Sequence, residues 1–132
     1  MPRQSTGQPT QVEMEILGIL WTEKKATARR VHDRLAELRD TNYSTTVKML
    51  AVMVEKGMVK RDESQRPLRF FAASSKKKTQ SKLLKNLIQK AYDGSASSLV
   101  MQALSSQKAT KEELQQIRDL LDQLEPDSGD IK

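Results

Sequence analysis

The sequence predicts a mostly α-helical chain with one small β-hairpin. Apolar residues recur at helical spacing in three short segments between residues 10 and 57. Two β-rich runs around a polar turn follow, and helical periodicity returns after residue 78. A chain of 132 residues buries only part of its surface, so we expect one small domain with a helical appendage that self-associates.

The first two helical segments are separated by the short polar link TEKKA. In the first segment, QVEMEILGILW, the apolar residues share one face, and Trp21 is expected in the core. Thr27 is the expected N-cap of the second segment, ATARRVHDRLAEL, because its hydroxyl can accept a hydrogen bond from a first-turn amide. Val31, Leu35 and Leu38 follow at i, i+4 and i+7, so all three are expected on the inner face.

The stretch NYSTTVKMLAVMVEKG predicts a third helix that begins with a hydroxyl-rich turn. Ser44 is the expected N-cap, and Gly57 is the expected left-handed residue after the last turn. Val47, Leu50 and Val54 are expected to face the core. Buried hydroxyls need partners, so the polar turn should face water or a hydrogen-bonding partner. The residues left on the outer face are Ser44, Thr45, Lys48 and Val52.

The runs MVKRD and LRFFAA flank the polar turn ESQRP, which predicts a β-hairpin directly after the third helix. Three short helices followed by a hairpin is the element order of a winged helix-turn-helix DNA-binding domain. We expect this domain over residues 10–75. In such a domain the third helix enters the major groove and the hairpin flanks it.

A helical dimerisation region is expected over residues 76–125. Three amphipathic helices in about 50 residues cannot bury all their faces alone, so a second copy of the chain is expected to cover them. Residues 1–9 and 126–132 are expected to be disordered. The residues expected at the dimer interface are Leu84, Leu87, Ile88, Leu99, Val100, Leu114, Ile117, Leu121 and Leu124.

The positive charge is confined to the first part of the chain. Residues 1–78 carry 16 Lys and Arg against 9 Asp and Glu, a net +7, while residues 79–132 carry 7 against 8, a net −1. A polyanion such as nucleic acid is the expected partner of the basic part, although an anionic membrane surface would satisfy the same arithmetic.

Several function classes are disfavoured by composition. The chain has no cysteine and a single histidine, His32, so thiolate metal sites and multi-histidine zinc sites are excluded, and no cofactor is expected. Neither a Gly-rich phosphate loop nor a Gly-x-Ser-x-Gly elbow is present, so we do not expect an enzyme. No apolar run approaches membrane-spanning length and no secretion signal is evident, which favours a cytoplasmic location without membrane contact.

The stretches EMEILGILW, RRVHDRLAE, YSTTVKMLAVMVEKGMVKR and DGSASSLV, in this order, resemble the penicillinase-repressor family of bacterial regulators, the BlaI/MecI type. The resemblance spans most of residues 10–124 and is most specific over residues 43–61 and in the Gly-Ser-x-x-Ser-Leu-Val stretch. It implies a homodimeric repressor that occupies a dyad-symmetric DNA operator. It also implies target genes such as β-lactamase or other cell-envelope stress functions.

The resemblance further implies a membrane sensor protease as a partner, which in several members cleaves the dimerisation region. The cleaved members carry an Asn-Phe pair after Leu-Val-Leu, whereas this chain has Met101 followed by Gln102 and Ala103. This departure argues against induction by that cleavage. The copper-responsive branch of the family carries a cysteine motif, which this chain lacks.

A helix that begins in a major groove offers free backbone N–H groups and a positive dipole to phosphate. On this basis Ser44 and Thr45 are expected to contact phosphate or a base edge, although capping alone would also explain Ser44. Lys48 can reach a guanine edge, and Val52 can contact a thymine methyl group. The alternative for Lys48 is an ordinary solvated lysine.

Four arginines and one tyrosine are further candidates for DNA contact. Arg29 and Arg30 open the second helix, which crosses the DNA backbone in helix-turn-helix docking. Tyr43 would lie on the sugar-phosphate edge or pack under the turn. Arg66 and Arg69 in the hairpin would hold phosphates and add affinity without reading sequence.

Three alternatives stay open at this point. The run at residues 76–78, KKK, precedes a helix, where it would be either a solvated link or a further DNA contact. The protein could be a winged helix regulator that senses a small ligand directly in a pocket between its dimerisation helices. It could also be a protein-interaction module whose basic hairpin and tail helices bind an acidic protein, with incidental DNA binding.

Overall fold

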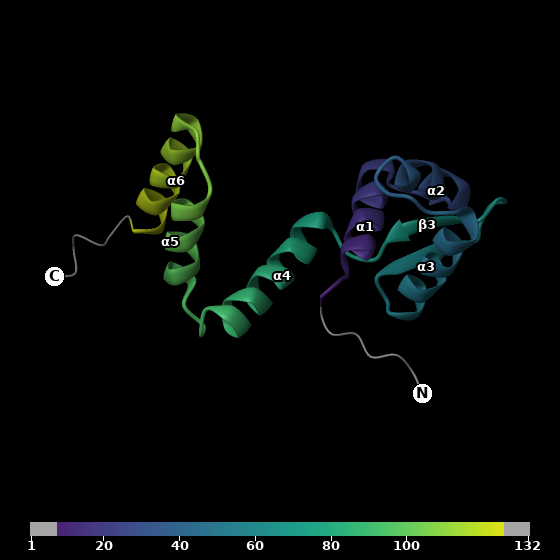
Figure 1. Cartoon of the computed structure of the whole chain (residues 1–132), viewed down its shortest axis with the longest axis horizontal. Coiled ribbons are helices and arrows are strands. Elements are labelled where there is room, and N and C mark those ends of the chain that lie inside the picture. The colour runs from purple at the N-terminus through teal and green to yellow at the C-terminus, as the bar shows by residue number, and fades with distance from the viewer. Residues whose placement is uncertain (1–7, 126–132) are drawn as a thin grey trace. The chain divides into compact units, whose positions relative to one another are not determined.

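The computed structural model of this chain describes residues 8–125. Of the segments predicted to be disordered, residues 1–7 and 126–132 lie outside that range, and residues 8 and 9 lie within it. The described residues divide into two compact units, one up to Leu87 and one from Ile88. The elements are α1 (Gln11–Glu23), β1 (Ala26–Thr27), α2 (Ala28–Ala36), α3 (Tyr43–Glu55), β2 (Val59–Asp62), β3 (Arg69–Ala72), α4 (Lys76–Ala91), α5 (Ala96–Ser106) and α6 (Lys111–Leu124) (Figure 1).

The first unit confirms the winged helix fold. Helices α1, α2 and α3 pack together beside a small antiparallel sheet (Figure 1). The sheet has the strand order β1-β3-β2, in which β2 and β3 form the predicted hairpin. The third strand, β1, was not predicted, because a two-residue strand has no sequence periodicity and exists only by pairing with β3.

One cluster of apolar side chains forms the core of this unit, and every helix and strand from α1 to β3 contributes to it. Trp21 packs at its edge as a half-buried ring, and its indole Nε1 donates a hydrogen bond to the Ser74 carbonyl at 2.9 Å. The buried members are Ile16, Leu17, Ile19, Leu20, Ala26, Val31, Leu35, Leu50, Met53, Val59 and Phe70.

Two predictions were made for α2, an N-cap at Thr27 and an inward position of Leu38, and only the first is confirmed. Thr27 is the N-cap as predicted, since its hydroxyl accepts from the Arg30 amide at 3.1 Å. The inward position of Leu38 was wrong. The helix ends at Ala36, before Leu38, and the Leu38 side chain is 59% exposed.

A buried ion pair joins the start of α1 to the end of α3. Thr10 and Glu13 form a capping box, and the second carboxylate oxygen of Glu13 accepts from Lys56 Nζ at 2.7 Å. The Glu13 side chain is buried and Lys56 is nearly so. Burial alone raises the pKa of Glu13, but the hydrogen bonds from Lys56 and Thr10 outweigh it, so this pKa lies below its usual value.

The helices that follow β3, from the end of the first unit through the second, bury far less than the helices before them. In α4, α5 and α6 no residue is buried, although each helix carries apolar side chains. The turn after α4 uses Asp93 and Gly94, both with positive φ, and Ser95 caps α5. Thr110 and Glu113 form a capping box at the start of α6. Among residues 8–125, no helix is both long enough and apolar enough to span a bilayer.

Replacing Lys56 should destabilise the first unit strongly, because the Glu13 carboxylate would remain buried without its counter-charge. We expect Lys56→Met to lower the free energy of unfolding by about 3 kcal/mol. The matched control is Lys60→Met at an exposed position of β2, which should change it by less than about 0.5 kcal/mol. Urea denaturation followed by circular dichroism measures the free energy of unfolding of both variants. If Lys56→Met and Lys60→Met lower it by the same small amount, the Glu13–Lys56 pair does not stabilise the domain.

Glu13 should also give the stability a defined pH dependence. Because its folded pKa is lowered, its contribution is present above the ordinary pKa of 4.5 and is lost as the pH falls through the folded value. Glu13→Gln removes this contribution, so the stability gap between wild type and variant should narrow on acidification. Denaturation at about pH 7 and about pH 3 tests this. Exposed Glu63→Gln should show no such change, and a pH-independent gap for Glu13→Gln would contradict the assignment.

Candidate nucleic-acid interface

The outer face of α3 presents the hydroxyls and the lysine that the sequence placed there. Ser44, Thr45 and Lys48 are exposed, and Ala51 continues the same face one turn further. Val52 is half-buried rather than outward, so its predicted exposure was wrong in part. The inner face buries Thr46, Leu50 and Met53.

Val47 is the clearest correction on this helix. The sequence placed it in the core, whereas its side chain is 40% exposed and lies between the exposed positions of Ser44, Lys48 and Ala51. Thr46 takes the buried position instead. Its hydroxyl donates to the Asn42 carbonyl at 3.3 Å and contacts His32 Nδ1 at 3.0 Å, so burying it leaves no unpaired polar atom.

The helix begins two residues earlier than a Ser44 cap predicts, because Asn42 rather than Ser44 is its N-cap. The Asn42 side-chain oxygen accepts from the Thr45 amide at 2.9 Å and from the Ser44 hydroxyl at 2.9 Å. Asparagine and serine are about equally good N-cap residues, and the helix here begins at the earlier of the two. The first-turn amides of Tyr43 and Ser44 have no intrahelical acceptor and remain available to an anion.

Tyr43 links α2 to the start of α3. The guanidinium of Arg29 lies 4.1 Å from the centre of its ring, and the His32 ring meets it edge-on at 5.7 Å. A cation held over an aromatic face loses little side-chain entropy when it later meets a phosphate. The structure therefore brings Arg29 and Tyr43 together with Ser44, as a set of polar groups at one end of α3.

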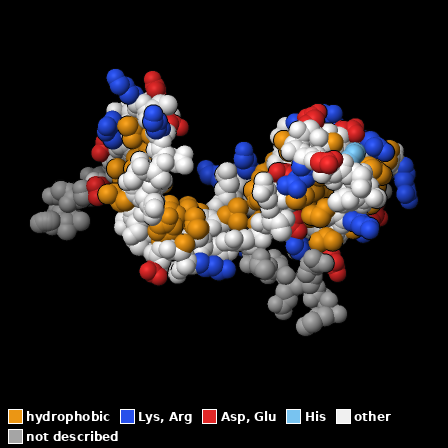
Figure 2. Space-filling model, in the orientation of Figure 1, with side chains coloured by type: hydrophobic (Ala, Val, Ile, Leu, Met, Phe, Trp, Pro, Cys, Tyr) orange, Lys and Arg blue, Asp and Glu red, His pale blue; other side chains and the backbone are white. Residues whose placement is uncertain are grey.

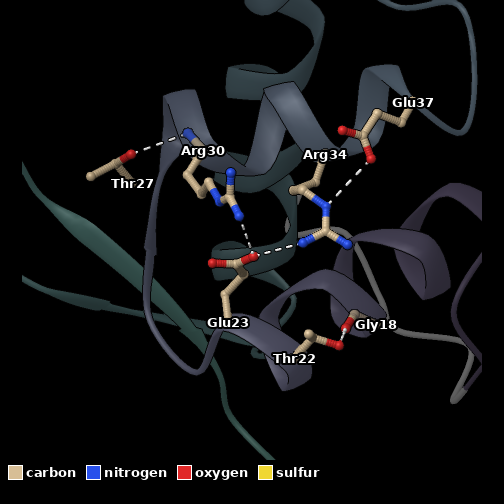
Figure 3. A network of polar contacts seen from close by, with 7 residues as sticks. All are labelled: Gly18, Thr22, Glu23, Thr27, Arg30, Arg34 and Glu37. Carbon is tan, nitrogen blue, oxygen red and sulfur yellow. Dashed lines mark hydrogen bonds and ion pairs between the residues drawn. The ribbon is translucent and has the colours of Figure 1, made fainter.

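Arg30 lies in a different environment from Arg29. Its guanidinium bonds to the Glu23 carboxylate at 3.0 Å, and Arg34 reaches the same carboxylate oxygen at 2.8 Å (Figure 3). The hydrogen bond from Arg30 is the main cause of the lowered pKa of Glu23, and Glu23 in turn raises the pKa of Arg30. Arg30 must break this exposed pair before it can contact a phosphate.

The two hairpin arginines that were predicted to contact DNA differ in their surroundings. Arg66 at the tip is exposed and makes no ion pair among the described residues. Arg69 is half-buried, and its Nη1 donates to the Gln65 side chain and the Pro67 carbonyl, both at 3.2 Å. Arg69 thus supports the turn, while Arg66 is free to meet a partner.

A salt bridge anchors the hairpin to the rest of the domain. Lys25 Nζ lies 2.6 Å from the Asp62 carboxylate at the end of β2, and the same ammonium lies 5.4 Å from the centre of the Phe71 ring. The hydrogen bond from Lys25, followed by those from Ser64, holds the pKa of Asp62 well below its usual value. Lys25 therefore favours the charged carboxylate and makes one partly exposed contact between the segment after α1 and the hairpin.

The residues predicted at a dimer interface are all at least partly exposed. Leu84, Leu87, Val100, Leu121 and Leu124 are exposed. Ile88, Leu99, Leu114 and Ile117 are half-buried. Hydrophobic side chains are visible at the surface of these helices in Figure 2.

The sequence did not single out three further apolar residues on the same helices, Met101, Leu104 and Leu120. All three are exposed, Met101 at 67%. Leu104 and Leu120 line one groove between α5 and α6 together with Ile117. Only the packing of α5 against α6 brings these positions to one surface, so the spacing within a single helix could not reveal them.

These features define a winged helix DNA-binding regulator, with a polar outer face on the third helix of a basic domain. The chain belongs to the penicillinase repressor family, whose model matches residues 9–123. It is a transcriptional repressor of this family, whose members are DNA-binding regulators and not enzymes.

The named relatives cover nearly the whole chain at low identity. The methicillin resistance regulatory protein MecI of Mammaliicoccus sciuri is 23% identical over 116 residues, which is 88% of this chain and 94% of that protein. MecI of Staphylococcus aureus strain N315 is 22% identical over the same shares. The penicillinase repressor of Staphylococcus aureus is 21% identical over 113 residues, 85% of this chain and 89% of that protein.

The cap assignment can be tested with a matched pair of variants. Asn42→Ala should lower the free energy of unfolding by about 1 kcal/mol, because the Thr45 amide loses its acceptor. Ser44→Ala should change it by less than about 0.5 kcal/mol, since the Ser44 hydroxyl is exposed. Thermal and urea denaturation measure both. A larger loss for Ser44→Ala would show that Ser44 is the functional cap.

Proposed function

We propose that this chain represses transcription as a homodimer that occupies a dyad-symmetric DNA operator. The observation that supports the reading surface is the outer face of α3. Hydroxyls, unpaired first-turn amides and Lys48 lie side by side there, on a helix whose inner face is fixed by buried Leu50 and Met53. Such a face can approach phosphate at its start and base edges one turn further.

The roles within the interface follow from the contacts of each side chain. Lys48 would donate to a guanine edge, and Val47 would add apolar contact with a thymine methyl group, a role that the sequence had given to Val52. Arg29, held over the ring of Tyr43, and Arg66 at the hairpin tip would neutralise phosphates. Arg30 would contribute less, because Glu23 already satisfies it.

The exposed apolar side chains of α4, α5 and α6 support pairing with a second copy of the chain. Three helices that bury no residue within the chain leave their apolar side chains in water, which costs free energy unless another surface covers them. A twofold arrangement would cover the same face on both chains. It would also hold two reading helices at one operator, so that binding of one half-site raises the effective concentration at the other.

The target genes are proposed from the relatives. Proteins named as regulators of methicillin resistance and as a penicillinase repressor suggest genes for β-lactam resistance, or other genes of cell-envelope stress. Release of the operator by the family's cleavage is not part of this proposal, because Met101, Gln102 and Ala103 replace the expected residues. Selection of bound fragments from a random DNA pool tests the proposal. The selected fragments should share an inverted repeat. Enrichment of no common sequence would refute it.

Two alanine variants separate sequence reading from general affinity. Lys48→Ala should weaken binding to the selected operator by about tenfold or more and weaken binding to random DNA much less. Arg66→Ala should weaken both by a similar factor, because it contacts only phosphate. Fluorescence anisotropy titrations at one fixed salt concentration give the Kd of each variant for the operator and for random DNA. Lys108→Ala, at an exposed position, is the control. If Lys48→Ala weakens binding to the operator and to random DNA by the same factor, Lys48 does not read a base.

A further inference from the structure

A cavity of about 320 Å³ lies in the first unit, away from the outer face of α3. It is bounded by α1, by the turn between α3 and β2, and by the first two turns of α4. Its apolar wall comes from Pro9, Leu17, Met58 and Leu83, and hydroxyls of Ser74 and Thr79 lie beside them. This size and mixture of lining groups suit a small organic molecule.

Three lysines line the same cavity, and they differ in whether their charge is already matched. Lys56 is neutralised by Glu13 at 2.7 Å. Lys78 and Lys82 are exposed and make no ion pair among the described residues. Two unmatched cations beside an apolar wall favour a ligand with a negative head and an apolar body.

The start of α4 makes the local field still more positive. Its first turn contains Lys76, Lys77 and Lys78 and no acidic residue, although the helix dipole already places positive charge there. Ser75 accepts the Lys78 amide at 3.1 Å and so satisfies one of the free amides without adding charge. An anion bound here would relieve a repulsion that nothing else in the described chain offsets.

We propose that this cavity binds a small anionic amphiphile, with its apolar part against Leu17, Met58 and Leu83 and its acidic group between Lys78 and Lys82. The site does not depend on operator binding, because it uses none of the residues on the outer face of α3. Since α4 continues past Leu87 into the second unit, a ligand at its base would act on the helix that connects the two units. This gives the run at residues 76–78 a role other than DNA contact.

Isothermal titration calorimetry with octanoate tests the site, and 1-octanol serves as the uncharged comparison. Octanoate should bind the full-length chain at one molecule per chain with a millimolar or lower Kd. The alcohol should bind at least about tenfold more weakly, because it lacks the charge that the lysines recognise. Equal binding of the two compounds, or no binding of octanoate, would overturn the proposal.

Two kinds of variant test where octanoate binds. The charge reversal Lys78→Glu with Lys82→Glu should weaken octanoate binding by about tenfold or more, whereas Lys85→Glu with Lys90→Glu, on the same helix but outside the cavity lining, should not. The filling variant Thr79→Phe should block binding with all lysines in place, whereas Gln80→Phe at an exposed position should not.

Two results with these variants would show that the lysines do not form a site for the amphiphile. If both double reversals weaken binding equally, octanoate responds to net charge alone and the proposal fails. If Lys78→Glu with Lys82→Glu weakens DNA binding and leaves octanoate binding unchanged, these lysines serve phosphate contact and the proposal also fails. Circular dichroism melting of each variant verifies the fold, and Thr79→Phe provides the decisive result if the charge reversals do not fold.

Discussion

The buried pair between Glu13 and Lys56 holds the end of α3 against the beginning of α1. Each charge would be costly to bury alone, so the two helices keep the one register in which carboxylate and ammonium meet at 2.7 Å. Near the other end of α3, a hydrogen bond between the Thr46 hydroxyl and His32 joins the helix to α2. With Leu50 and Met53 buried between these two contacts, the face that α3 turns to solvent is fixed before any partner arrives.

The two parts of the chain differ in how much of their apolar surface they bury within the chain. The winged helix has its own core of buried apolar side chains and a net positive charge, which attracts a polyanion. The helices α4, α5 and α6 bury no residue within the chain. A repressor that reads DNA with one part and pairs through the other is the division of labour that this contrast favours.

Periodicity and turn residues predicted the helices, the hairpin and the cap at Thr27, because these depend on neighbours in the sequence. Contacts between distant segments decided what was missed. Strand β1 exists only through pairing with β3, and Thr46 is buried only because His32 supplies a partner, which turns Val47 outward. Capping preferences could not decide between Asn42 and Ser44, because asparagine and serine cap helices about equally well.

The stoichiometry of the complex on a selected operator duplex tests the central claim most directly. Sedimentation velocity of the labelled duplex with increasing protein should show a step to two chains per duplex and essentially no species with one. Halving the inverted repeat should then leave only weak binding, because the second reading helix loses its half-site. A stable complex of one chain per duplex, bound equally well by the half repeat, would contradict the account.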